Sequence, residues 1–574
     1  MSFFCGLLLS FAAAAVRPGA DSGLLLEGAT VYVSAEATPR RADILVRDDR
    51  IAFVGDPSEA HRIAPGAARV DLTGRFIFPG WADAHGHLSG LGRAFETADL
   101  KGASDAAEAA RRIAAAAAAL PQGAWAEGRG WDQNRWPGQK FPDATDLDAL
   151  LPDRPAVARR VDGHAVWINS AALRAARIDP STRDPQGGRI LRRADGSPSG
   201  VLVDRATGLV ESVLPAESAG DFERRVLAAS RACAKAGLTE VQEASHSSGA
   251  EIASFARLAD SGQLPIRIYA TVSSSAGELA AFFAKGPRVG KGSDFLTVRA
   301  IKALADGALG SRGAALLTDY SDEPGNRGLL VTPPDRLEEL ARQARQNGWQ
   351  LWIHAIGDRG NRLALDAFAK AASALRVAPA GGTRPRIEHA QVISPADIPR
   401  FGREGVIASI QPTHATSDMP WAEIRIGPER IAGAYAWRSL KKAGARLAGG
   451  SDFPVESENP LLGFYAAVTR QDLDGKPAGG WRPQEKLTRR EALALFTADA
   501  AFAAFEEDRR GRIAPGFDAD LSVFDRDPME APEKEIPRIA PVLTVVGGRI
   551  TYGRGLVGGG LHGPAGPMSA GRAR

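Results

Sequence analysis

Cysteine is scarce in this chain of 574 residues, and its scarcity excludes two kinds of site. Cys5 and Cys233 are the only cysteines, so neither a disulfide framework nor a zinc site built from thiolates is possible. Charge of one sign is also missing, because 71 basic and 68 acidic residues leave a formal charge of only +3. No stripe of basic and aromatic residues offsets this balance. Nucleic acid is therefore not an expected partner.

Long apolar runs are missing as well. The run from Phe3 to Val16 is shorter than the roughly 20 residues of a spanning helix, so no stable membrane span is expected. Its length and the small residues Ala12–Ala15 predict that residues 1–20 are a signal peptide, which would make the protein periplasmic or secreted. No positive charge precedes the run, which leaves open a mis-set start codon and a cytoplasmic protein. Residues 554–574, rich in Gly, Pro and Arg, predict a disordered tail.

Alternating segments at both ends of the chain predict strands. At the N-terminal end, within residues 24–75, they predict a small antiparallel sheet. Similar segments recur within residues 506–553, so the simplest explanation is one β domain built from both chain ends. The segments are Leu24–Val33, Ala42–Val54, Ala68–Leu72, Asp518–Phe524 and Val542–Tyr552.

Between these ends, over residues 76–505, short apolar strands alternate with helical segments. Phe76–Trp81 is nearly continuous in apolar residues, the pattern of a strand buried on both faces. This α/β alternation predicts a parallel barrel or a doubly wound sheet. Residues 91–239 are too long for one barrel connection, and helical patterns such as Ala103–Leu120 predict an insertion that caps one face. Further strands are expected at Gln350–His354, Arg386–His389, Val406–Gln411 and Ala445–Gly449, with a helix over Asn361–Leu375.

Ionisable residues stand at the ends of these strands. Residues i and i+2 of a strand point to the same side, so His85 and His87 are expected to converge. In a barrel the carboxyl ends of all strands face one site, so residues far apart in sequence can meet there. Imidazoles and a carboxylate, without thiolates, suit a divalent ion such as zinc in an open site. The residues are His85, His87, Lys302, His354, His389 and Asp452.

Lys302 and Asp452 each have a chemical and a structural interpretation. A lysine ammonium cannot ligate a metal, but a buried neutral amine can add carbon dioxide. The resulting carbamate could bridge two metals about 3.5–4 Å apart; the alternative for Lys302 is an ion pair with Asp306. Asp452 could carry a proton from a bridging water to a leaving nitrogen, or it could be a turn or N-cap aspartate.

Several stretches of the chain resemble the amidohydrolase superfamily of metal-dependent hydrolases. The resemblance is greatest to amidohydrolase family 3, the branch that includes the YtcJ-like proteins and the N-substituted formamide deformylases. It covers nearly all of the chain between the leader and the tail. The stretches are PGWADAHGHL (79–88), GWDQNRWP (130–137), DGHAVWINSAAL (162–173), IKALADGALGSRGAALL (301–317), LWIHAIGDRGN (351–361), RIEHAQ (386–391), QPTHAT (411–416), AGGSDFPVESENP (448–460), LTRREALALFTADAAFAAF (487–505) and GRIAPGFDADLSVFDRDP (511–528).

The resemblance implies a fold and a metal centre. The fold is a distorted (β/α)8 TIM-like barrel with a small β-sandwich built from both chain ends. His85 and His87 would bind the more buried metal, and His354 and His389 the other. Lys302 matches the carboxylated bridging lysine, and Asp452 matches the last ligand and proton shuttle. The implied cofactors are two divalent ions, zinc above others, with carbon dioxide as the carbamate; a homodimer is a family-level expectation.

Four further residues are candidate substrate contacts, each with a structural alternative. His164, His414 and Arg312 could contact the substrate or hold their own loops. Trp131 could form an apolar wall of the pocket or pack in the core with Trp136. The remaining histidines, His61, His246 and His562, have no converging partners and are expected to lie at the surface or in packing.

Together these features predict a hydrolase for a small molecule. The reaction would break a non-peptide C–N bond, amide or formamide-like, through a metal-bridging hydroxide with Asp452 as the proton shuttle. An esterase, lactonase or phosphoesterase on the same metals remains an alternative, as does a regulatory protein that keeps the metal without turnover. A one-metal deaminase would leave Lys302 without a role.

Overall fold

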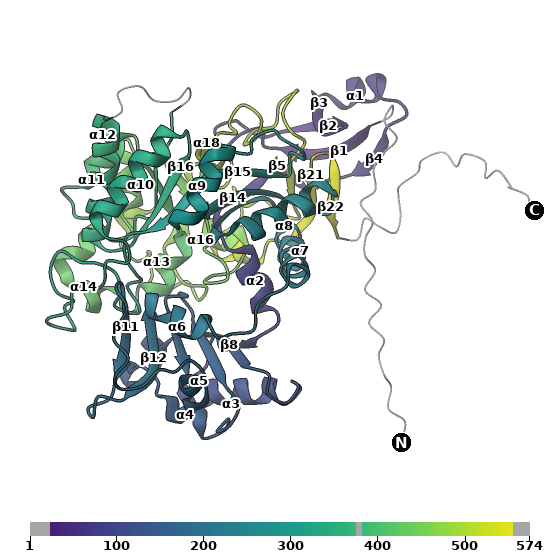
Figure 1. The fold of residues 1–574 in the computed structure, drawn as a ribbon. Helices are drawn as coiled ribbons and strands as arrows, with labels where there is room; N and C mark the ends of the chain where they lie inside the picture. Colours follow the sequence, from purple (N-terminus) through teal and green to yellow (C-terminus); the bar gives the residue numbers. More distant parts are fainter. Residues whose placement is uncertain (1–22, 375–381, 555–574) are drawn as a thin grey trace, which may run out of the picture.

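The computed structural model describes residues 23–374 and 382–554. These form a β domain from both chain ends, a barrel, and a lobe inserted after the first barrel strand (Figure 1). The expected signal peptide, the tail from residue 555, Leu375, Cys5 and His562 lie outside the described residues. Within the described ranges, no helix combines the length and the apolar character needed to cross a membrane.

Both chain ends build one sheet, as expected. The N-terminal and C-terminal strands lie side by side, drawn in purple and yellow in Figure 1. Side chains of this sheet form a hydrophobic core that is separate from the core of the barrel. Helix α1 (Pro57–Ile63) packs on β2 and β3. The sheet is mixed rather than antiparallel, because β4 and β5 both run parallel to β1. Its strands are β1 (Leu24–Val31), β2 (Arg40–Arg47), β3 (Arg50–Gly55), β4 (Ala68–Asp71), β5 (Phe76–Pro79), β20 (Leu521–Phe524), β21 (Pro541–Val546) and β22 (Arg549–Gly553).

Phe76–Trp81 is not a single barrel strand, which corrects one expectation. Its first part is β5 of the end sheet, and β6 (Trp81–Gly86) is the first barrel strand. The chain passes from one sheet to the other at Gly80, where a Cβ atom would collide with Thr239. Both strands are buried, so hydrophobicity alone could not reveal the boundary between them.

Eight parallel strands form the barrel. They follow one another in chain order, from β6 to β19, with most of the helices packed outside. Strands β6 and β19 are not hydrogen-bonded to each other, so the barrel is nearly closed rather than closed. The strands after β6 are β13 (Leu238–Ser247), β14 (Arg267–Ser273), β15 (Leu296–Leu304), β16 (Gln350–Ala355), β17 (Arg386–His389), β18 (Ile407–Ile410) and β19 (Leu447–Gly449).

Most of the barrel helices are amphipathic and bury one face, whereas α16 (Pro460–Thr469) is buried on nearly all sides. Helix α7, for example, buries Val226, Ala229 and Cys233, as expected for this cysteine. The helices are α2 (Leu88–Ala94), α7 (Ala219–Lys235), α8 (Gly249–Asp260), α9 (Ala276–Lys285), α10 (Pro334–Gln346), α11 (Asp358–Ala374), α12 (Ile398–Glu404), α13 (Pro412–Asp418), α14 (Ala422–Arg430), α15 (Trp437–Lys442), α16 (Pro460–Thr469), α17 (Arg489–Leu495) and α18 (Ala498–Ala503).

The inserted lobe is built on a six-stranded sheet, where helices were expected. Helix α3 (Ala106–Ala117) matches the predicted helix, but the lobe ends earlier than residue 239, because α7 packs on α2 and α8 in the barrel layer. The other elements of the lobe are β7 (Ala98–Asp99), β8 (Ala126–Trp131), β9 (Ala156–Arg160), β10 (Ala165–Ile168), β11 (Gly188–Arg192), β12 (Pro198–Asp204), α4 (Ala144–Asp148), α5 (Ser170–Ala175) and α6 (Gly208–Glu211).

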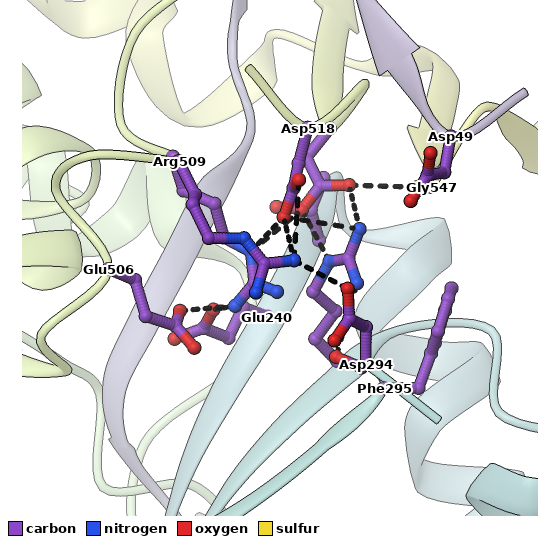
Figure 2. Close-up of polar contacts among 12 residues, drawn as sticks. Asp49, Glu240, Asp294, Phe295, Glu506, Arg509, Asp518 and Gly547 are labelled. Atoms are coloured by element: carbon purple, nitrogen blue, oxygen red, sulfur yellow. Dashed lines mark hydrogen bonds and ion pairs between the residues drawn. The ribbon is translucent and has the colours of Figure 1, made fainter. Parts of the chain in front are cut away.

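A buried charge cluster joins the end sheet to the amino-terminal ends of the barrel strands. Arg267 Nε lies 2.7 Å from Asp520 Oδ2, and Arg510 Nη1 lies 3.1 Å from Glu240 Oε2. Figure 2 shows Glu240, Glu506 and Asp518 converging on this cluster. Burial raises the pKa of Glu240 well above its usual range, and the neighbouring Glu506 carboxylate raises it further.

We expect Glu240→Gln to flatten the pH dependence of stability. Because the pKa of Glu240 is raised in the folded state, its contribution to stability is fully present below the pKa of the unfolded state. That contribution is lost as the pH rises through the pKa of the folded state. Each proton involved changes the free energy of unfolding by about 1.4 kcal/mol per pH unit. Urea unfolding of both proteins at several pH values measures the slope. Glu339→Gln is the control, because the Arg342 hydrogen bond lowers the pKa of that carboxyl; equal slopes for wild type and Glu240→Gln would contradict the expectation.

Candidate metal centre

The structure brings the predicted metal ligands together at the carboxyl ends of the barrel strands. His85 lies in β6 and His87 directly follows it, His354 lies in β16, and His389 ends β17. Ring centroids are 5.4 Å apart for His85 and His87, 4.9 Å for His85 and His389, and 4.5 Å for His354 and His389. Gly86 between the first two is needed, because a Cβ there would collide with Phe453.

Asp452 stands at the centre of this group. Its Oδ1 lies 2.9 Å from His87 Nε2 and 3.5 Å from His85 Nε2, and its Oδ2 lies 3.7 Å from His414 Nε2. Two sets of donor atoms share this carboxylate, one with His85 and His87 and the other with His389 and His414. Burial alone would raise the pKa of Asp452, but the hydrogen bond from His87 and the nearby imidazoles lower it. The carboxylate is therefore ionised.

The imidazoles are oriented by bonds to the ring nitrogen that faces away from the centre. Nδ1 of His85 lies 2.5 Å from Glu388 Oε2, and Nδ1 of His389 lies 2.8 Å from Gln411 Oε1. His87 Nδ1 is similarly 3.0 Å from Ser245 Oγ. These bonds leave Nε2 of each ring free to face the centre, the arrangement usual for histidine ligands.

This donor set fits a divalent cation. His85 Nε2 is buried and has no hydrogen-bond partner, a cost that ligation would remove. Burial holds the pKa values of His85, His354 and His389 well below the usual range, so these rings are neutral and able to ligate. Nitrogen and carboxylate donors without thiolates suit zinc and similar ions.

The sequence interpretation missed the charged pair beneath the centre. Arg386 Nε lies 2.9 Å from Glu388 Oε1, and its guanidinium stacks 3.7 Å from the Trp352 ring centroid. Glu388 in turn holds His85, so the Arg386 charge keeps a fully buried carboxylate in place. Charged residues at alternate positions of a fully buried strand were the available signal, since they must be paired there.

Lys302 lies in β15 and points into the same cavity as the histidines and Asp452. Burial lowers the pKa of its ammonium. The expected alternative, an ion pair with Asp306, does not form: within the described ranges Lys302 has no carboxylate oxygen at ion-pair distance. Asp306 instead accepts backbone N–H groups of Ala315 and Gly357, both at 2.8 Å.

Two of the four candidate substrate contacts line the cavities, and two do not. His164 and His414 line a cavity, and the His164 ring lies 4.9 Å from the ring of His354. Trp131 is fully buried in the core of the lobe, where its Nε1 donates to Ala158 O at 2.8 Å. Arg312 is held by Asp322 and Glu323, each at 3.0 Å, and fixes its loop. Trp131 and Arg312 thus take the structural alternative that the sequence had left open for each, and they are not substrate contacts.

Two cavities meet at the centre. One, of about 510 Å³, runs between the lobe and the loops after β15 and β18; the other, of about 780 Å³, runs between the lobe and the ends of β6, β13 and β14. Both are lined by His164, His354, His389 and Asp452. His246, expected at the surface or in packing, lines the larger cavity.

Comparison with known proteins places the chain in a family. The sequence profile of the amidohydrolase family matches residues 68–552, so the chain belongs to this family of hydrolases. It is 33% identical to the putative amidohydrolase YtcJ of Bacillus subtilis over 92% of this chain and 98% of that protein. It is 28% identical to the N-substituted formamide deformylase of Arthrobacter pascens over 89% of this chain and 95% of that protein.

A solved structure agrees with this assignment. The crystal structure of an uncharacterized metal-dependent hydrolase from Pyrococcus horikoshii superimposes with a TM-score of 0.71 at 27% identity, covering 89% of this chain and 99% of that one. The fold is therefore that of a metal-dependent hydrolase, as expected from the sequence.

We expect Glu388→Gln to weaken metal binding. Without the carboxylate, His85 loses the bond that fixes its ring, which typically costs 10- to 100-fold in affinity. Competition with a chromophoric zinc chelator measures the Kd. The control is Glu485→Gln, a buried carboxylate that holds Ser439 and lines neither cavity. An unchanged Kd in a folded Glu388→Gln protein would remove this residue from the metal site.

Proposed function

We propose that this protein hydrolyses a non-peptide C–N bond, of an amide or a formamide, in a small molecule. The observation that carries the proposal is the position of the Asp452 carboxylate, between the two donor sets and open to both cavities. The similarity to an N-substituted formamide deformylase supports an amide-like substrate.

We assign the metal ligands to His85, His87, His354, His389 and Asp452, for two divalent ions with zinc favoured. When bound, such ions polarise a carbonyl group and lower the pKa of water to near 7. Lys302 lines the cavity that His85, His87, His354 and His389 also line, and no carboxylate of residues 23–374 or 382–554 forms an ion pair with it. A neutral amine at Lys302 could add carbon dioxide with loss of a proton, and the resulting carboxylate would serve as a further ligand for the ions.

The protein's own groups then complete the hydrolysis. Asp452 takes a proton from the attacking water as the oxygen bonds to the carbonyl carbon. When the C–N bond breaks, Asp452 returns the proton to the nitrogen, and the products are a carboxylic acid and an amine. His164 Nδ1 donates a hydrogen bond to the Asp204 carboxylate at 2.7 Å, and this bond offsets the effect of burial and raises the pKa of the imidazole. His164 is thus suited to donate a hydrogen bond from its other nitrogen to the substrate carbonyl.

We expect Lys302→Ala to reduce the metal content. Protein expressed with zinc and bicarbonate should hold about two ions per chain, and the variant one or none, because the bridging group is lost. Plasma mass spectrometry measures the stoichiometry. Lys101→Ala is the control, because Lys101 lines one cavity but donates to Val455 O at 2.9 Å. A single ion that Lys302→Ala leaves in place would favour a mononuclear centre.

We expect Asp452→Asn to lower kcat by about 10²- to 10⁴-fold, because the amide cannot carry the proton. A panel of N-substituted formamides, other amides, esters, lactones and phosphoesters is assayed with metal content measured in parallel. Asp132→Asn, at the wall of the same cavity, should retain most of the activity. Turnover of esters, lactones or phosphoesters without amides would overturn the proposed bond type, and full activity in Asp452→Asn would exclude the proposed shuttle.

A further inference from the structure

The wall of the larger cavity carries several arginines, and most of them are paired with carboxylates. Arg93 Nη2 lies 2.7 Å from Glu127 Oε2, and Arg159 Nη2 lies 2.7 Å from Glu211 Oε1. Arg225 is likewise bound to Glu96 and Glu217. These pairs neutralise the wall and leave little for a ligand to gain from binding them.

Arg129 differs from these arginines. Within the described ranges it forms no ion pair, its Nε is buried without a hydrogen-bond partner, and its one hydrogen bond is from Nη2 to Val161 O at 3.4 Å. Burial and the Arg159 charge lower the pKa of Arg129 to about 10, while Asp452 and Asp162 act in the opposite direction without pairing with it. At neutral pH the guanidinium is therefore still charged. Arg129 is partly exposed to the cavity, so an anion there can reach the guanidinium and pair with a charge that has no carboxylate partner among the described residues.

The backbone of the lobe places the Arg129 side chain in the wall of the larger cavity. The ladder between β8 and β9 is irregular after Arg129, where Gly130 has a φ of 109°. Trp131 enters the core of the lobe, whereas Arg129 lines the cavity that also holds His85, His87, Lys302 and Asp452. A Cβ placed on Gly163 would lie 3.8 Å from Arg129 Nη2, so the guanidinium is beside the turn that carries His164.

We propose that Arg129 binds a carboxylate of the substrate, so that the compounds hydrolysed are N-acyl or N-formyl molecules with a free carboxylate. A guanidinium binds a carboxylate through two parallel N–H bonds, which fixes orientation as well as charge. With its carboxylate on Arg129, the substrate would extend past His164 toward Asp452. This inference rests on the proposed function for the bond that breaks, but the anion site itself does not depend on turnover.

Kinetics on matched compounds test the substrate class. N-formyl and N-acetyl amino acids are each compared with their C-terminal amides, using zinc-loaded wild type, Arg129→Met and Arg159→Met. For the acids, kcat/KM should fall about 10- to 100-fold in Arg129→Met, the size expected for a hydrogen bond between charged groups. For the amides it should stay the same. Arg159 faces Arg129 on the neighbouring strand and is already paired, so Arg159→Met should change neither value.

Binding without turnover tests the anion site by itself. N-acetylglycine should raise the Tm of the wild type and not of Arg129→Met, and N-acetylglycinamide should raise the Tm of neither. Binding of the acid with no amide hydrolysed would support this inference and overturn the proposed function. Hydrolysis with no preference for acids, or an equal loss in Arg159→Met, would overturn this inference and leave the proposed function standing. No Tm shift with the acid would also overturn it.

Discussion

The site depends on the contact that closes the barrel between its first and last strands. Strands β6 and β19 share no ladder, and Asp83 joins them instead: its carboxylate accepts from the backbone N–H of His85 at 2.9 Å and from the Ser451 hydroxyl at 2.6 Å. The next residue, Asp452, donates its N–H to His85 O at 2.7 Å. Asp452 has a φ of 60°, in the left-handed region that residues other than glycine rarely adopt, so its surroundings must hold it there. This closure holds the Asp452 carboxylate against the imidazoles of β6.

The barrel and the lobe contribute different chemistry to the two cavities. The barrel provides the donors for the metal, on rigid strand ends backed by Arg386 and Glu388. The lobe provides His164 and Arg129, which approach from the opposite wall. The candidate metal ligands and the candidate substrate contacts therefore stand on different parts of the fold.

The sequence predicted which side chains meet where ionisable residues stand at the ends of buried strands, because such residues have few possible roles there. His85, His87, Lys302, His354, His389 and Asp452 were all expected at one site, and all six line the larger cavity, while their roles stay predictions. Glu388 and Asp83 were missed because the groups that they hold, His85 and Ser451, are distant from them in sequence. The pair of Arg386 with Glu388 lies within one strand and was a signal that the sequence interpretation did not use. The choice for Trp131 stayed open because an aromatic residue beside a polar loop suits a pocket wall and a core, and the structure places it in the core of the lobe. The break at Gly80 was missed because both strands that it separates are apolar.

The sequence by itself determined the fold class and the residue types that meet at the candidate centre. Apolar periodicity predicts strand and helix, and an imidazole or a carboxylate can ligate a metal wherever the fold places it. Only the tertiary structure decided which groups are left without partners. Arg129 and Arg159 are alike in sequence, but Glu211 neutralises Arg159, and no carboxylate in the described part of the chain pairs with Arg129. Pairing depends on distances of a few ångströms between segments far apart in the chain, and no local pattern records those distances.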